Sequence, residues 1–156
     1  MNTQIVKLYS ANSTLILQTK PAIEILYWGE KLQTDFDVNV LSTLKRAVPH
    51  GRLDTDIPLT LSPEHGRGLF SSPGLEGHRN GKDWSPVFHF KSLTEEQNAL
   101  LVVCEDTIAG LQLHIELRLD PQTDVLQLRH SLTNLKPEMY QVDRFAVTLP
   151  LPERAD

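Results

Sequence analysis

The chain has 156 residues, of which 40% are hydrophobic and 22% are charged, and its formal net charge is -5. These proportions are typical of one folded domain and exclude the disordered, collagen-like and coiled-coil classes. The acidic balance, without a cluster of Lys and Arg, also excludes a nucleic-acid-binding surface. A single domain over residues 1–156 is therefore the predicted organisation.

The N-terminal third predicts strands and one short helix. Apolar and polar residues alternate over three short segments: residues 5–9, 15–17 and 23–28. Asp37 is a plausible N-cap, because its side chain can accept a hydrogen bond from the first turn of a helix. The apolar residues of that helix would share one side: Val40, Leu41, Leu44 and Val48.

Glycine and proline interrupt every possible element over residues 49–83, which predicts a long Gly/Pro-rich loop. Structureless loops longer than about 12 to 15 residues are uncommon inside compact domains and are usually either functional or disordered. The segment is therefore expected to be either a functional loop or a flexible connector.

The C-terminal half predicts five strands: residues 85–92, 99–105, 111–119, 126–132 and 140–149. The clearest alternation runs from Leu111 to Leu119, and a turn follows it over residues 120–124. The last strand changes phase near Asp143, where a bulge could absorb the extra residue. The last three strands form a predicted meander, and eight strands in all predict an all-β fold of two packed antiparallel sheets.

The single cysteine and the N-terminus bear on the compartment. Cys104 lies in an apolar run and has no partner for a disulfide, so we expect a buried structural thiol. The N-terminus lacks the pattern of a signal peptide, and no segment approaches the roughly 20 apolar residues of a membrane span. A cytoplasmic protein without membrane contact is the expectation.

The six histidines show neither of the usual metal-ligand spacings, and no cysteine pair supports them, so we expect no metal and no cofactor. His130 falls on the apolar face of its strand and predicts a hydrogen-bonded core histidine. His114 falls on the polar face. Most carboxylates stand at predicted turns, where solvation explains them.

Asp54 differs from the other carboxylates because it lies at the start of the glycine-rich loop. The same loop and its end carry Arg67, His78, Arg79 and Trp84. Carboxylates accept hydrogen bonds from vicinal hydroxyls and aromatic rings cover the apolar face of a pyranose, so this mixture is typical of sugar binding. Solvated loops have a similar content.

Several short motifs resemble one family. They are Ile25-Leu26-Tyr27-Trp28-Gly29-Glu30-Lys31-Leu32, Leu53-Asp54-Thr55 before the glycine-rich loop, Leu117-Arg118-Leu119, and the closing residues 149–156. Together they resemble the N-terminal domain of glycoside hydrolase family 36 α-galactosidases. The resemblance runs through nearly the whole chain.

The resemblance implies a β-supersandwich that precedes a (β/α)8 barrel, in an enzyme that hydrolyses terminal α-galactosides with retention. The family's two catalytic aspartates lie in Lys-Trp-Asp and Ser-Asp motifs of the barrel, and neither motif occurs here; Lys82-Asp83-Trp84 has a different order. The chain should therefore be the N-terminal fragment of a larger glycosidase and inactive alone.

For individual residues the resemblance implies one role. Asp54 matches an aspartate that contacts the sugar, often across a subunit interface, so substrate binding in a homo-oligomer is expected of it. The loop after Asp54 departs from the family, because Gly66-Arg67-Gly68-Leu69-Phe70 replaces a stretch similar to Gly-Asp-Phe-Arg.

Two alternatives stay open. The first is a self-contained carbohydrate-binding sandwich whose long loop forms the sugar site. The second is a mutarotase-like epimerase, which needs a histidine pair and a carboxylate on one concave face. His114 and Glu116 share a strand face, but no second histidine clearly joins them.

Overall fold

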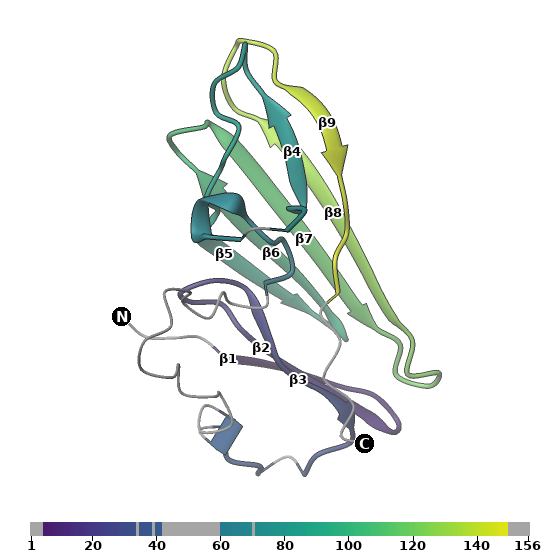
Figure 1. Cartoon of the computed structure of the whole chain (residues 1–156). Helices are drawn as coiled ribbons and strands as arrows, with labels where there is room; N and C mark the ends of the chain where they lie inside the picture. Colours follow the sequence, from purple (N-terminus) through teal and green to yellow (C-terminus); the bar gives the residue numbers. More distant parts are fainter. Residues whose placement is uncertain (1–4, 34, 39, 42–59, 70, 150–156) are drawn as a thin grey trace, which may run out of the picture.

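A computed structural model describes residues 5–33, 35–38, 40–41, 60–69 and 71–149, and these residues are almost entirely β-structure (Figure 1). The strands are β1 (Ile5–Tyr9), β2 (Ser13–Gln18), β3 (Glu24–Glu30), β4 (Leu75–His78), β5 (His89–Glu96), β6 (Ala99–Asp106), β7 (Leu111–Leu119), β8 (Leu126–Asn134) and β9 (Gln141–Phe145). The 3-10 helix η1 spans His65–Arg67. No helix in the described ranges is long and apolar enough to cross a membrane. The predicted all-β antiparallel sandwich is confirmed.

The larger sheet has the order β5-β6-β7-β8, and all its neighbouring strands are antiparallel. Its central strand β7 alternates as the sequence predicts, with every second side chain buried. Leu113 lies between Cys104 and Leu132 in this register and is 1% exposed. One face of the sheet therefore forms the core, and the other faces outward.

Two smaller sheets cover the inner face of the larger one. The β4-β9 pair lies over its upper half and the β1-β2-β3 sheet over its lower half (Figure 1). All three sheets contribute to one apolar cluster, for example through Leu15, Leu75 and Leu117. Burial of one such leucine stabilises a fold by about 1.5 to 3 kcal/mol.

The structure corrects the extent of the predicted loop, because η1 and β4 lie within residues 60–83. The hydropathy pattern does not predict β4, because Gly77 occupies one of its inward positions and has no apolar side chain. A Cβ atom at Gly77 would lie 2.4 Å from the carbonyl oxygen of Gln141 and 2.7 Å from the Tyr140 ring. The close approach of β4 to β9 therefore requires glycine.

The predicted meander of the last three strands is wrong in its final step. β9 pairs with β4, whereas β7 and β8 form the expected hairpin. The expected irregularity is present: Glu76 pairs with Arg144 and Gly77 with Val142, so Asp143 is the extra residue of a bulge. Nine strands are described where eight were expected, and β4 is the additional one.

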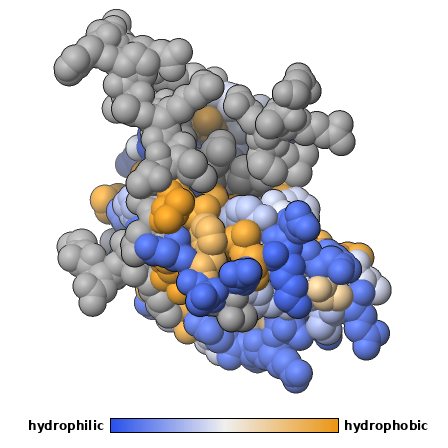
Figure 2. Space-filling view, turned by 90° about the horizontal axis from the view of Figure 1, so that it is seen from below, coloured by the Kyte–Doolittle hydropathy of each residue, from blue (hydrophilic) through white to orange (hydrophobic). Residues whose placement is uncertain are grey.

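The sheet β1-β2-β3 is covered on both faces. Leu15 and Leu17 face the main core, and Ile16, on the opposite face of β2, is also only 1% exposed. The turn that begins at Asp37 has the expected helical start, with the Val40 amide donating to the Asp37 carbonyl at 3.2 Å, and it buries Leu41. Leu44 and Val48 lie outside the described residues. Figure 2, which views this end from below, shows apolar residues gathered beside the grey ones.

Candidate functional site

Asp54, the predicted sugar-binding residue, lies outside the described residues. The described chain resumes at Thr60, which forms a β-bridge with Glu24, while the Leu61 amide donates to the Ile23 carbonyl at 3.1 Å. Leu61 is fully buried. The residues that follow the Asp54 segment are thus fixed to the first strand layer.

Arg67 is held by its own segment and by the residue before β5. Its Nε donates to Glu64 Oε2 at 2.7 Å and its Nη2 to the Phe88 carbonyl at 2.7 Å. The Phe88 amide donates to Glu64 Oε1 at 3.2 Å. Burial raises the pKa of Glu64 to about 7, although the nearby Arg67 cation opposes this shift. This pair secures η1 to the sandwich, so Arg67 has a structural role.

Arg79 is the second arginine expected near the site, and it is 7% exposed. It pairs with Asp83, donates to the Ala109 carbonyl at 2.9 Å and donates to Asn134 Oδ1 at 2.6 Å. Its guanidinium carbon lies 5.5 Å from the centre of the Tyr140 ring. Arg79 therefore joins three segments of the upper end of the sandwich and has no free donor face for a ligand.

Partial burial works against ionisation of Asp83, but hydrogen bonds from Arg79 and Lys136 outweigh it and lower the Asp83 pKa. A carboxylate held between two cations is a poor nucleophile. Asp83 therefore stabilises the fold, in agreement with the reversed order of the Lys82-Asp83-Trp84 motif.

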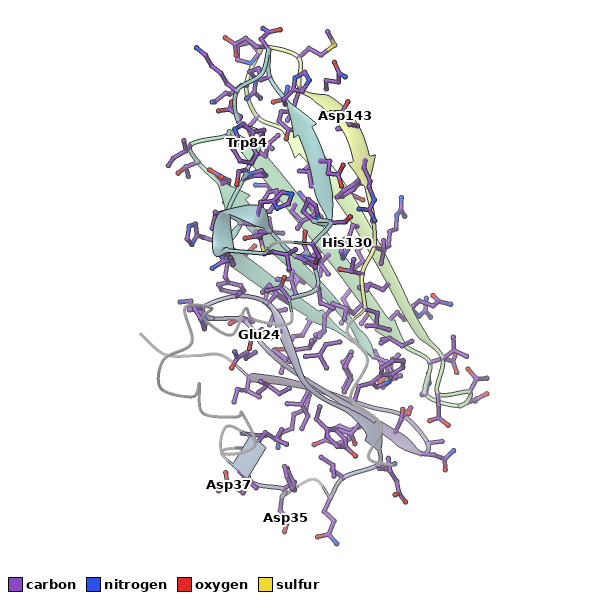
Figure 3. All side chains as sticks on the ribbon, viewed as in Figure 1. Glu24, Asp35, Asp37, Trp84, His130 and Asp143 are labelled. Carbon is purple, nitrogen blue, oxygen red and sulfur yellow. The ribbon has the colours of Figure 1, made fainter. Side chains whose placement is uncertain are left out.

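Trp84 is the one large aromatic residue of the expected group that faces solvent, with 61% of its surface exposed. Its ring lies 6.4 Å from that of His65 at an interplanar angle of 58°. His78 accepts from the Gly81 amide at 3.4 Å through Nδ1. Figure 3 places Trp84 in the upper half of the molecule, far from Asp35 and Asp37. Arg67 and Arg79 therefore hold parts of the sandwich together, whereas Trp84 is exposed on its surface.

The polar-face histidine is located as predicted. His114 and Glu116 both lie on the outer face of β7, and His114 Nε2 is 2.8 Å from Gln112 Oε1. Within the described part of the chain, no group of three His, Cys, Asp or Glu side chains is arranged to hold a metal ion.

His130 lies in the body of the sandwich, 9% exposed, with its ring 6.1 Å from that of Phe145 (Figure 3). The predicted core position is confirmed. The predicted hydrogen bond is not found, because neither ring nitrogen has a partner at normal hydrogen-bond geometry among the described residues. Burial lowers the pKa of His130, and the nearby Ala146 carbonyl only partly opposes this. The buried ring is therefore neutral.

This burial predicts a pH effect on stability. The unfolded imidazole has its ordinary pKa of about 6.5 and binds a proton more readily than the folded one. The free energy of unfolding therefore has its full value above that pH, where both the folded and the unfolded imidazole are neutral. It falls as the pH drops toward the lower pKa of folded His130, because the unfolded state then binds the proton first. Urea titrations at pH 8 and pH 5 should show that the free energy of unfolding falls less between these two pH values in His130→Leu than in the wild type. An equal loss in both proteins would contradict a neutral buried His130.

Cys104 is 2% exposed and belongs to the main core, as predicted for a structural thiol. Burial raises its pKa to about 12, so the thiolate is scarce at neutral pH. We expect iodoacetamide to leave the native chain unmodified for hours and to alkylate it within minutes in urea, as measured by intact mass. Rapid labelling of the native protein would show that this strand opens.

The comparisons with known proteins agree with one another. The family model described as "Glycosyl hydrolase family 36 N-terminal domain" matches residues 21–156. An α-galactosidase from Escherichia coli is 49% identical over 150 residues, which make up 96% of this chain and 21% of that protein. This chain thus spans about a fifth of the length of that relative.

Two solved structures share the fold. The α-galactosidase AgaA from Geobacillus stearothermophilus, in complex with 1-deoxygalactonojirimycin, has a TM-score of 0.74 and 15% identity over 92% of this chain and 24% of its own. The α-galactosidase from Lactobacillus brevis has a TM-score of 0.73 and 16% identity over 93% of this chain and 23% of its own.

Proposed function

The chain belongs to the glycosyl hydrolase family 36 N-terminal domains, and from this membership we propose that it is the N-terminal domain of an α-galactosidase acting on galactooligosaccharides. The observation that carries the proposal is the 49% identity with the E. coli α-galactosidase. In this proposal residues 1–156 form one β-sandwich domain, which supports a catalytic barrel elsewhere in the parent enzyme.

The parent's chemistry would reside in that barrel. Retention requires a nucleophile and an acid/base whose carboxyl groups are only about 5 to 5.5 Å apart. The sequence lacks both family motifs, and Asp83 is engaged by Arg79 and Lys136. We therefore expect the 156-residue chain to leave an aryl α-galactoside unhydrolysed and the parent enzyme to cleave it. Hydrolysis by the chain alone would overturn the proposal.

Asp54 is the residue proposed to reach the substrate. In the parent enzyme, Asp54→Ala should reduce kcat/KM for an α-galactoside by more than about tenfold, which is about 1.4 kcal/mol of lost transition-state binding. The physical reason is the loss of a carboxylate that accepts hydrogen bonds from sugar hydroxyls. Steady-state kinetics measure this directly.

Asp35→Ala is the matched control, because Asp35 is also an acidic residue of the N-terminal third and is exposed. It should leave kcat/KM unchanged, and both variants should retain the parent's melting temperature. Unchanged kinetics in Asp54→Ala would remove Asp54 from the site while leaving the family membership intact.

The proposal extends to a cytoplasmic homo-oligomer. Half-exposed apolar residues on and after β9, Val142 and Val147, support a contact surface, since surfaces buried in assemblies are often apolar. Sedimentation of the parent enzyme at micromolar concentration would test the oligomer, and a monomer would exclude it.

A further inference from the structure

The outer face of the larger sheet contains a hollow of about 450 Å³. It lies over neighbouring strands β6, β7 and β8 and the end of β5, and its side chains include Glu96, Leu101, Glu116, Arg118, Gln127 and Arg129. Its volume is within the range of roughly 300 to 1,000 Å³ that small-molecule sites occupy. The alternation of the strands explains its position, because Leu100 and Leu117 point into the core from the same region.

The pairing register arranges the side chains of the hollow in rows. Leu101 pairs with Glu116, and Glu116 pairs with Arg129, so an apolar, an acidic and a basic side chain follow one another across the sheet. Leu101 is half-buried, whereas Glu116 and Arg129 are exposed. The row therefore offers an apolar floor beside an acceptor and a donor.

Three charged groups of the hollow are free to bind. Glu96, Glu116 and Arg129 form neither a hydrogen bond nor an ion pair with any residue that the structure describes, although Glu116 and Arg129 are direct cross-strand partners. A directly opposed acid and base usually attract each other across strands. Without an ion pair between them, both carboxylate oxygens and the guanidinium fork are available to a ligand.

The chemistry of the lining indicates a neutral, polyhydroxylated ligand. Two carboxylates disfavour an anion, and two guanidinium groups disfavour a cation. Protein–protein contacts are anchored by Trp, Tyr and Arg, and the hollow has arginines but no Trp or Tyr. None of the exposed large apolar residues of the described chain lines it either: Val40, Trp84, Ile108, Val125, Leu135, Met139, Val142 and Val147. Hydroxyl groups both donate and accept, so a sugar can satisfy an acid and a base together.

We propose that this hollow is an oligosaccharide-binding site, in which Glu116 and Arg129 hydrogen-bond to vicinal hydroxyls and Leu101 contacts the C–H face of a sugar ring. The site is separate from Asp54 and from the chemistry proposed for the parent enzyme. Its function would be to hold an oligosaccharide on the domain without hydrolysing it.

Calorimetric titration of the 156-residue chain with stachyose, a neutral tetrasaccharide, tests the site. We expect a dissociation constant in the millimolar range, which corresponds to about -4 kcal/mol. Glu116→Gln and Arg129→Gln should each weaken binding by at least about tenfold, because each removes one charged hydrogen-bond partner. Circular dichroism would verify that both exposed substitutions leave the fold intact.

Two further variants distinguish the hollow from the rest of the surface and from the Asp54 segment. Asp143→Asn, an exposed change on β9, should keep the wild-type affinity, whereas Asp54→Ala measures how much of the heat comes from the sugar contact proposed at Asp54. The proposal is overturned by the absence of heat at about 50 mM stachyose, or by wild-type affinity in Glu116→Gln and Arg129→Gln. It is also overturned if sedimentation shows a dimer that Arg129→Gln dissociates, since the face would then bind a second copy. Loss of binding in Asp54→Ala alone would assign the sugar to the Asp54 segment.

Discussion

Leu113→Ala should lower the free energy of unfolding of the chain by about 2 to 5 kcal/mol. Leu113 lies at the centre of the larger sheet between Cys104 and Leu132 and is 1% exposed, so its removal leaves a cavity that the neighbouring strands cannot fill. Urea unfolding followed by circular dichroism measures the change. In the parent enzyme, the remaining folded molecules should keep the wild-type kcat/KM, because the side chain acts only through stability.

The control is Ile108→Ala in the turn between β6 and β7. Ile108 is also a large aliphatic residue but is 84% exposed. Its replacement should change the unfolding free energy by no more than about 0.5 kcal/mol. If Leu113→Ala caused an equally small change, the inner face of β7 would not be the core of this domain.

Arg79→Met should lower the unfolding free energy by about 2 to 4 kcal/mol. Methionine preserves much of the length of the side chain but leaves the Ala109 carbonyl without its donor and Asp83 without its closer cation. Asn134 Oδ1 loses one of its two donors and keeps the Lys136 amide. The turn after β4 should also loosen, because Arg79 joins it to the turn between β6 and β7 and to the end of β8. Hydrogen exchange of the Lys82 amide, which donates to the Arg79 carbonyl at 2.9 Å, would report this loosening.

Lys136→Met tests whether the loss of unfolding free energy in Arg79→Met comes from the burial of the arginine or from its charge. Lys136 also contacts Asp83, at 3.4 Å, but its side chain is 36% exposed. Exposed ion pairs contribute about 0 to 1 kcal/mol, so we expect a correspondingly small loss. Equal losses in both variants would indicate that Asp83 pairing, rather than the buried arginine, holds the upper end together.

The strands of the larger sheet could be predicted from the sequence because their side chains alternate with the backbone. Leu111–Leu119 has the pattern of a half-buried strand and is one, and the bulge near Asp143 follows from the same period. The short strand β4 lacks this alternation, because glycine takes the place of an inward apolar side chain.

The candidate site was harder to predict. Arg67, Arg79 and Trp84 are close in sequence to the glycine-rich loop and look alike as hydrogen-bonding or aromatic residues. Burial separates them: the arginines bind backbone carbonyls within the framework, while Trp84 faces solvent. The oligosaccharide-binding hollow had only a partial signal, the shared face of His114 and Glu116, because its remaining side chains come from other strands.

By itself, the sequence determined the all-β class, the local strand positions and the family, since these depend on side-chain period and on short motifs. Only the tertiary structure decided that β9 pairs with β4, that Arg79 is buried and that Glu116 lies opposite Arg129 without an ion pair. The physical reason is that pairing register and burial depend on contacts between residues far apart in the chain. A local hydropathy pattern does not determine which distant residues make those contacts.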